Sequence, residues 1–239
     1  MTGETPALCL DRVTRTFRRG EEVVRALDDV SLVLMAGEFV AIAGPSGSGK
    51  TTLLNVAGGL DRPDAGRVLV GGQDLGALSP GALARLRLER IGFVFQAFNL
   101  VPVLSAEENA EFVLLMRGTP APERRARVRA LLARVGLAGL EGRRPAQLSG
   151  GQQQRVAVVR AIAAEPTLVL ADEPTANLDS TTAAALLDVM EELHHERRTT
   201  FLFSTHDPRV MERAHRLVRL RDGQIESDEA LPARPGASP

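Results

Sequence analysis

The chain has 239 residues, of which 44% are hydrophobic and 25% charged, as is usual for a globular protein with one large α/β domain. Its formal net charge is −1, so a basic surface for DNA or RNA is not expected. Cys9 is the only cysteine, which excludes an intrachain disulfide and a cysteine zinc cluster. We interpret Cys9 as a small buried residue of an early strand.

Signals for membrane insertion and secretion are both missing from the sequence. No stretch reaches the roughly 18 consecutive apolar residues that a membrane helix needs. The first residues also lack a basic start followed by an apolar segment, which is the pattern of a secretory signal. We therefore expect a cytoplasmic protein that reaches a membrane only through a partner.

Short strands are predicted near the N-terminus, at residues 8–14, 23–26 and 30–34. Phe17 lies in the turn between the first two of them. Its ring can stack on a nucleotide base or pack beneath a loop, and the sequence leaves both interpretations open.

The next segment joins an apolar strand, residues 39–43, to a glycine loop and a helix. Residues 44–51 fit the pattern G-x-x-x-x-G-K-[ST], in which glycines let backbone N–H groups curl around the oxygens of a polyphosphate. Lys50, the only lysine of the chain, supplies a point charge for the β- and γ-phosphates, and the Thr51 hydroxyl can ligate Mg²⁺. A glycine-rich turn without a ligand is the alternative for this motif taken alone. The residues predicted to hold the triphosphate are Gly44, Pro45, Ser46, Gly47, Ser48, Gly49, Lys50, Thr51 and Thr52.

A strand at 67–70 and a helix at 79–90 follow a turn at 61–66. Residues 91–95 then predict a core strand that delivers Gln96 to a loop at its carboxyl end, where ligands gather in open α/β sheets. The Gln96 amide can hold a metal ion or a water molecule there.

Residues 97–150 contain predicted helices and no predicted strand. Ser105 and Glu108 fit a capping box, and a second helix at 122–135 has apolar residues at helical spacing. We interpret the arginines of this second helix as a solvated face. Because the segment interrupts a strand-rich pattern, it predicts a small helical subdomain.

Ser149 is the predicted cap of the helix that runs on to residue 164. It is followed by Gly150, Gly151 and Gln152. A serine and two glycines at a helix N-terminus form a second anion site, for which an enzyme with one nucleotide has no need. An ordinary capped helix is the alternative.

An apolar run at 167–171 predicts a buried strand that ends in Asp172 and Glu173. Adjacent carboxylates repel each other, and a protein keeps them together when one binds Mg²⁺ and the other polarises an attacking water. We assign Asp172 to the metal and Glu173 to the base. A surface turn with two solvated acids is the alternative.

The last part of the chain predicts a helix up to residue 196, a buried strand at 199–204 and a hairpin around residues 222–223. His206 follows the buried strand, where its side chain can reach a γ-phosphate; a structural histidine is the alternative. From Ser227 the chain is acidic and then rich in Pro, Ala and Gly, so residues 227–239 predict a disordered tail.

Together these motifs resemble, in type and order, the ATP-binding subunit of ABC transporters over residues 5–226. The resemblance implies an α/β fold: a P-loop NTPase (RecA-like) core with an N-terminal antiparallel β-subdomain and an inserted α-helical subdomain. The core then comprises residues 5–96 and 151–226, and the helical subdomain residues 97–150. ATP and Mg²⁺ are the implied ligands.

The same resemblance gives roles to individual residues. Gln96 becomes the Q-loop glutamine, which binds the metal, and His206 the γ-phosphate switch. Asp179 becomes the aspartate of the D-loop, in which Asn177 and Leu178 also match. Two cassettes of the family pair head to tail, so a second copy of this chain is the expected partner. The signature residues that then complete the partner's ATP site are Ser149, Gly150, Gly151 and Gln152.

Finer sequence features look like the lipoprotein-release and macrolide-export branch of the family. They are the runs at 58–63, 90–96 and 98–100. In that branch the cassette works on the cytoplasmic face of the plasma (inner) membrane with a permease that carries a large extracytoplasmic domain. Phe17 departs from the family, since many members have tyrosine there.

Other classes explain the sequence less well. A P-loop kinase has no use for the signature at 148–152, a DNA-repair ATPase would show a coiled coil and zinc cysteines, and a translation factor would carry more than one cassette. A cassette that regulates a membrane partner, such as an activator of cell-wall hydrolases, has the same motifs and stays an alternative.

Overall fold

The computed structural model describes residues 5–20, 22–176 and 178–232. Contacts divide the chain into two compact units. We call Met1–Leu78 with Thr200–Pro239 the phosphate-loop unit and Ser79–Thr199 the helical unit. The predicted helical subdomain at 97–150 lies within the helical unit, and the predicted domain boundaries stay a prediction.

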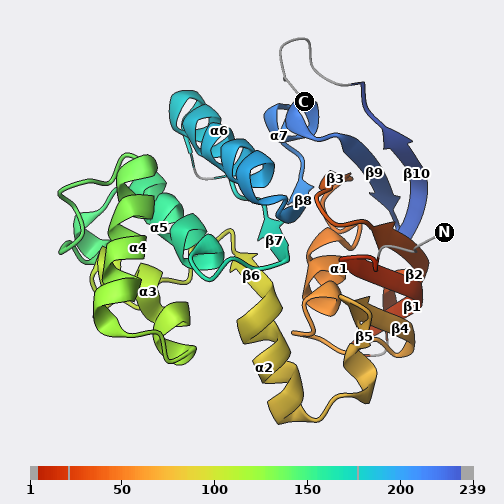
Figure 1. The fold of residues 1–239 in the computed structure, drawn as a ribbon. Coiled ribbons are helices and arrows are strands. Elements are labelled where there is room, and N and C mark those ends of the chain that lie inside the picture. Colours follow the sequence, from red (N-terminus) through yellow and green to blue (C-terminus); the bar gives the residue numbers. More distant parts are fainter. Residues whose placement is uncertain (1–4, 21, 177, 233–239) are drawn as a thin grey trace. The chain divides into compact units, whose positions relative to one another are not determined.

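An antiparallel sheet in the order β2-β1-β4-β5 opens the phosphate-loop unit (Figure 1). The first two predicted strands are longer than expected, because β-bulges let the chain continue through irregular positions. One such position is Asp29, with a φ of 53°, whose N–H donates to the Thr14 hydroxyl. The predicted strands at 23–26 and 30–34 are therefore one strand. Cys9 is partly exposed on β1, not buried as predicted. The bounds are β1 Leu8–Arg19, β2 Glu22–Leu34, β4 Ala65–Val70 and β5 Gln73–Asp74, followed by a 3-10 turn, Leu75–Ala77.

A second sheet in this unit has the strand order β10-β9-β3-β8. Strand β3 pairs in parallel with both β8 and β9, and is buried at every position as a strand covered on both faces must be. Its core includes Phe39, whose ring centroid lies 4.6 Å from that of Phe203 and 5.4 Å from that of Phe201. The bounds are β3 Phe39–Ala43, β8 Thr200–Thr205, β9 Arg216–Arg221 and β10 Gln224–Ala230.

The hairpin β9–β10 turns at Asp222 and Gly223, both with positive φ, as the sequence predicted. Strand β10 continues through Ala230, so the prediction of disorder from Ser227 is wrong for residues 227–230, which pair with β9. Residues 233–239 lie outside the described part of the chain. The helices of this unit are α1 Lys50–Ala57 and α7 Pro208–Arg213, of which α7 was not predicted.

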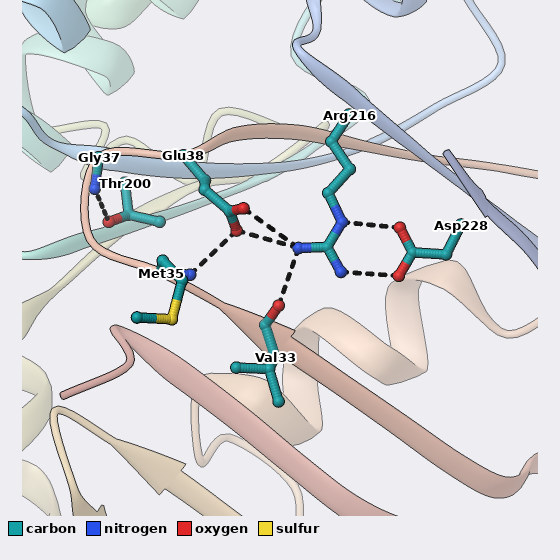
Figure 2. A network of polar contacts seen from close by, with 7 residues as sticks. All are labelled: Val33, Met35, Gly37, Glu38, Thr200, Arg216 and Asp228. Carbon is teal, nitrogen blue, oxygen red and sulfur yellow. Dashed lines mark hydrogen bonds and ion pairs between the residues drawn. The ribbon is translucent and has the colours of Figure 1, made fainter. Parts of the chain in front are cut away.

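Arg216 of β9 joins three segments of the phosphate-loop unit (Figure 2). Its guanidinium donates two hydrogen bonds of 2.6 Å to Asp228 on β10, one of 2.9 Å to the Val33 carbonyl on β2 and one of 3.1 Å to Glu38. Glu38 also accepts a hydrogen bond from the Met35 N–H. Hydrogen bonding to Asp228, together with the charge of Glu38, raises the pKa of Arg216. The network therefore ties the two sheets of this unit together.

The helical unit contains a parallel pair of strands, β6 and β7, and most of the helices. The predicted capping box of Ser105 and Glu108 is confirmed at α3, and Ser79 caps α2. Along the described parts of the chain, no helix combines the length and hydrophobicity that crossing a membrane requires. The bounds are α2 Pro80–Arg90, β6 Ile91–Val94, α3 Ala106–Met116, α4 Ala121–Arg134, a 3-10 turn Pro145–Gln147, α5 Gly150–Ile162, β7 Leu168–Asp172 and α6 Ser180–Arg197.

The prediction of a solvated arginine face on α4 is wrong for Arg124 and Arg127, which are partly buried, whereas Arg125, Arg129 and Arg134 are exposed. Arg124 lies 3.0 Å from Glu111 on α3, with both side chains largely buried. Further pairs join α4 to α3 and α6, and another reaches the loop before β7. The sequence could not show this, because the carboxylate partners lie on other helices. The further pairs are Arg129 with Glu107, Arg134 with Glu192 and Glu196, and Arg127 with Glu165.

Candidate functional site

The glycine loop leaves the carboxyl end of β3 and leads directly into α1. Gly47 and Gly49 have φ angles of 82° and 105°, a left-handed conformation that glycine adopts without strain. The Lys50 side chain is 8% exposed, and its ammonium donates to the carbonyls of Gly44 (2.8 Å) and Pro45 (2.9 Å). The loop therefore closes around the lysine side chain.

Backbone of strands β2 and β9 and of the β9–β10 turn packs against the loop. A Cβ atom on Gly44 would lie 2.1 Å from the Leu220 carbonyl oxygen, and one on Gly49 would lie 2.2 Å from that of Ala26. The Gly223 N–H, in the β9–β10 turn, donates to the Ser48 carbonyl at 3.0 Å. No side chain larger than hydrogen fits at Gly44 or Gly49 without moving backbone.

Asp28 of β2 holds the β9–β10 turn in place. The Asp28 N–H donates to the Gly223 carbonyl at 2.8 Å, and its carboxylate accepts hydrogen bonds from Gln224 and Arg25. These hydrogen bonds hold the pKa of Asp28 below its ordinary value, and the one from Gln224 has the largest effect. Gly223 and Asp28 support the loop, and sequence reasoning identified neither of these roles. The Asp-Gly turn was predicted, but the sequence could not show which residues the turn contacts.

The loop fits a polyphosphate. The cap residue of α1 is Gly49, which has no side chain to satisfy the first N–H groups of the helix. Those donors, the positive end of the helix dipole and the Lys50 charge converge on one place. Ser48 is 2% exposed and its hydroxyl has no hydrogen-bond partner among the described residues, while Thr51 is exposed at the start of the helix. The donor set is that of an anion site.

His206 and the glycine loop begin at the same edge of the sheet. Strands β3 and β8 are parallel neighbours, with Ala43 opposite Thr205. Gly44 and His206 are the next residues on the two strands, and the His206 side chain is exposed. The structure therefore places His206 and the phosphate loop at one edge, and the sequence had placed His206 after a buried strand.

The carboxylates and Gln96 share an edge in the helical unit. Strands β6 and β7 are parallel with Val94 opposite Ala171, so Gln96 and Asp172 both follow the carboxyl ends of neighbouring strands. Asp172 and Glu173 are half-buried, which contradicts the alternative of two fully solvated acids. Glu173 has a φ of 46°, a strained conformation for a residue with a Cβ atom, and this kind of strain is concentrated at functional sites.

Ser149 caps α5, as predicted, and does so in a capping box. Its hydroxyl accepts a hydrogen bond from the Gln152 N–H, and the Gln152 side chain accepts one from the Ser149 N–H. A Cβ on Gly151 would lie 2.7 Å from a methyl group of Thr182 on α6. Asp179 caps α6, and hydrogen bonds from the Thr182 hydroxyl and N–H lower its pKa. The signature and the D-loop aspartate therefore lie close together within this unit.

Arg160 is a residue of this unit that the sequence did not single out. From α5, its guanidinium donates to the carbonyls of Phe98 (2.8 Å) and Asn99 (2.5 Å), and burial lowers its pKa. Phe98 and Asn99 have φ angles of 59° and 50°. Neither residue is glycine, so only the contact in the folded chain reveals that Arg160 holds the loop after Gln96.

The predicted residues thus form two groups. Lys50, the glycine loop, His206 and Phe17 belong to the phosphate-loop unit, whereas Gln96 and the residues at 149–152 and 172–179 belong to the helical unit. Phe17 lies on β1 with 40% of its surface exposed. Asn177, which matched the D-loop pattern, lies outside the described residues.

The fold and these sites define a nucleotide-binding P-loop cassette. The model of the family described as ABC transporter matches residues 27–176, and the chain belongs to that family. The fold class predicted from the sequence is confirmed by two solved cassettes, each with a TM-score of 0.90 and 42% identity over 95% of this chain and 100% of the other. One is described as a dimeric bacterial ABC transporter cassette, MJ0796, and the other as a dimeric post-hydrolysis state of MJ0796 bound to ADP and Pi.

Curated relatives are similar across nearly the whole chain. The macrolide export ATP-binding/permease protein MacB of Hyphomonas neptunium is 50% identical over 93% of this chain and 34% of its own length. MacB 1/2 of Paracoccus denitrificans is 47% identical over 98% of this chain and 35% of its own length. The chain thus spans about a third of the length of the curated relatives it matches.

Proposed function

We propose that this chain binds ATP with Mg²⁺, hydrolyses it, and so powers an integral-membrane permease of the export type. The observation that carries the proposal is the phosphate loop. Lys50 closes against the carbonyls of Gly44 and Pro45. A Cβ atom on Gly44 or Gly49 would lie within 2.2 Å of a backbone oxygen, so only glycine fits at either position. A loop shaped this tightly around one lysine is explained by triphosphate binding.

Each part of the nucleotide has its own group of residues in this proposal. The loop backbone and Lys50 hold the phosphates, and Phe17 stacks on the base with its exposed ring. The metal is held by the Thr51 hydroxyl, Gln96 and Asp172. Mg²⁺ neutralises charge that develops on the phosphate oxygens. Among the described residues no group of three or more acidic, histidine or cysteine side chains could hold a metal ion by itself, and Mg²⁺ bound mainly by phosphate and water needs none.

Hydrolysis needs a base, and Glu173 is the residue we assign to it. Its carboxylate follows a buried strand next to Asp172, the residue we assign to the metal, and a carboxylate beside the metal ligand suits the activation of an attacking water. His206 senses or stabilises the γ-phosphate from the edge that it shares with the loop. The catalytic residues are then Glu173, His206 and Lys50.

A second copy of the chain completes each ATP site. The N-terminus of α5 has the Ser149 cap and glycines but no phosphate loop of its own, and both solved relatives named above are described as dimers. In a head-to-tail homodimer, Ser149, Gly150, Gly151 and Gln152 of one chain meet the γ-phosphate bound by the other, with Asp179 beside them.

The membrane partner is a permease with an extracytoplasmic domain, and the cassette lies on the cytoplasmic face of the plasma (inner) membrane. The names of the relatives join an ATP-binding function to a permease function. Nucleic acid is not a partner, since the net charge is −1. The alternative of a regulator that does not transport is not favoured, because the relatives named above are exporters.

Phosphate release by the purified chain tests the hydrolytic part of the proposal. With ATP and Mg²⁺ the wild-type chain releases phosphate, and omission of Mg²⁺ or replacement of ATP by ADP stops the release. Reconstitution with the permease in vesicles tests the partner, since a coupled permease changes the rate of hydrolysis. A chain that binds no ATP, or an ATPase rate indifferent to the permease, would contradict the corresponding part.

A further inference from the structure

The segment after α1, residues 60–64, has no part in the function described so far. It is fixed to the end of that helix, since the N–H groups of Leu60 and Asp61 donate to the Asn55 carbonyl at 2.8 and 3.2 Å. From there it reaches strand β1: the Asp64 N–H donates to the Thr14 carbonyl, and the Thr16 N–H donates to the Asp64 carboxylate at 2.6 Å. The segment therefore links the phosphate-loop helix to β1.

Two carboxylates of this segment hold one arginine. Arg15 Nε donates to Asp61 at 2.9 Å and its terminal nitrogen donates to Asp64 at 2.8 Å. The Arg15 side chain is only 23% exposed. Burial by itself would lower the pKa of Arg15, but hydrogen bonds to the two carboxylates outweigh it and raise the pKa. The guanidinium thus stays charged, and a carboxylate holds its Nε atom and another holds one of its terminal nitrogens.

The same guanidinium lies on the ring of Phe17. Arg15 and Phe17 are two residues apart on β1, so their side chains leave the same face of the strand. The central carbon of the guanidinium is 4.8 Å from the ring centroid, within the range of a cation–π contact. One face of the ring is covered by this contact, although 40% of the residue stays exposed.

We propose that Arg15 is a positioning residue for base recognition: anchored by Asp61 and Asp64, it supports one face of Phe17 so that the other face receives the purine of the nucleotide. This rests on the proposed function, in which Phe17 stacks on the base. Since the guanidinium covers one face of the Phe17 ring, the base can stack only on the opposite face. The link through residues 60–64 also fixes the base-binding ring relative to α1, whose N-terminus belongs to the phosphate site.

The test compares a ligand that has a base with one that lacks it. Calorimetry on the full chain measures the affinity for ATP and for inorganic tripolyphosphate, both with Mg²⁺, and the ratio of the two reports the contribution of the nucleoside, that is, of the base and its ribose. Phe17→Leu is expected to lower the ratio about tenfold, since stacking on an aromatic side chain contributes strongly to base binding. Arg15→Gln is expected to lower it about three- to fivefold and to leave tripolyphosphate binding unchanged.

Two further variants complete the design. In Arg15→Gln/Phe17→Leu the ratio should equal that of Phe17→Leu alone, because Arg15 acts through the ring. Arg67→Gln is the matched control: Arg67 on β4 pairs with Asp11 of β1 at 2.7 Å in the same sheet, and we expect no change in the ratio. If Arg15→Gln does not fold, Asp61→Asn removes one anchor, keeps the cation and should lower the ratio about twofold.

The outcomes separate the inference from the function on which it rests. A ratio unchanged by Phe17→Leu would overturn the aromatic base site and the inference together. A ratio lowered by Phe17→Leu but unchanged by Arg15→Gln, or by Asp61→Asn in its place, would overturn the inference alone. Equal losses for ATP and tripolyphosphate in Arg15→Gln would also overturn it, because Arg15 would then support the fold or the phosphates and not the base.

Discussion

The helices α1 and α5 both have glycines of a predicted nucleotide-binding motif at their N-termini, yet these N-termini are built differently. At α1 the cap is Gly49, and the loop is supported by backbone of β2 and of the β9–β10 hairpin. At α5 the cap is Ser149, which forms a capping box with Gln152 and needs no distant backbone. The first N-terminus leaves its donors for a ligand, while the second is already capped by its own side chains. We therefore interpret the N-terminus of α1 as a phosphate site that is complete within one chain. The N-terminus of α5 is then a surface that meets the phosphate bound by another chain.

Glu173→Gln should give the largest effect, because it separates nucleotide binding from chemistry. The amide keeps the shape of the side chain but cannot accept a proton, so turnover should fall about 100- to 10,000-fold. ATP affinity should stay within about twofold of wild type, as the α1 cradle is untouched. Phosphate release and calorimetry measure the two quantities. Near-normal turnover would show that Glu173 is not the base.

Lys50→Ala tests the phosphate site at the N-terminus of α1. Loss of a charge-assisted contact to the phosphates should weaken ATP binding about 10- to 100-fold.

Because Lys50 is the only lysine, an amine-reactive reagent labels it and the N-terminal amine alone. Bound ATP should protect Lys50 from the reagent, as read by mass spectrometry. Equal labelling with and without ATP would contradict the cradle.

Gly223→Ala tests whether the hairpin supports the loop. Gly223 has a φ of 78°, and a Cβ there would lie 3.0 Å from the Ala26 carbonyl oxygen. Gly118 has the same φ, with no described atom within 4 Å of its Cβ position, and so is a matched control. Both alanine variants should be destabilised by about 1 kcal/mol through the backbone alone. Only Gly223→Ala should also weaken ATP binding several-fold; equal ATP affinities in the two variants would argue against the support.

The smallest expected effect is a difference in acid sensitivity between the two N-termini. The pKa of Asp28 is lowered from the ordinary 3.8, chiefly by the Gln224 hydrogen bond, so its stabilisation is present above that pH and is lost as the pH falls through the lowered value. Asp28→Asn should therefore lower Tm more at pH 7 than at a pH below 3.8. Ser149→Ala removes an uncharged cap, so its effect on Tm should be similar at both pH values. Thermal melts at the two pH values show whether the contrast holds.

Sequence reasoning located the structural elements well where local chemistry decides them, and the roles given to the site residues stay predictions. Strand β3, the start of α1 at Lys50 and the cap at Ser149 follow from burial, glycine spacing and hydrogen-bonding side chains that are neighbours in the chain. His206 was singled out because it follows a buried strand, and ligands gather at the carboxyl ends of strands in open α/β sheets.

The features that the sequence did not reveal depend on contacts between distant residues. Gly223 supports Ser48 from a hairpin far along the chain, and Arg160 fixes a turn whose left-handed residues are not glycines. The α4 arginines seemed solvated because their carboxylates lie on other helices. Each of these could be found only once the fold had brought the two partners together.

The central claim is that the N-terminus of α5 completes the ATP site of a second chain, and Ser149→Asp tests it. Aspartate caps a helix as well as serine does, so the fold is kept, while its charge would face the γ-phosphate of the partner. Gly151→Asp is a poorer test, because any Cβ there would lie 2.7 Å from Thr182 and disturb the cap at Asp179. Ser105→Asp, in the matching capping box of α3, is the control.

Sedimentation velocity in the Glu173→Gln background, with ATP and Mg²⁺, with ADP and without nucleotide, is the most direct measurement. Glu173→Gln and its Ser105→Asp derivative should be monomers without nucleotide or with ADP and dimers with ATP. The Ser149→Asp derivative should bind ATP normally and stay a monomer, with dimerisation weakened on the order of 100-fold. A dimer that forms without ATP, or a Ser149→Asp derivative that dimerises with ATP as readily as its control, would contradict the account.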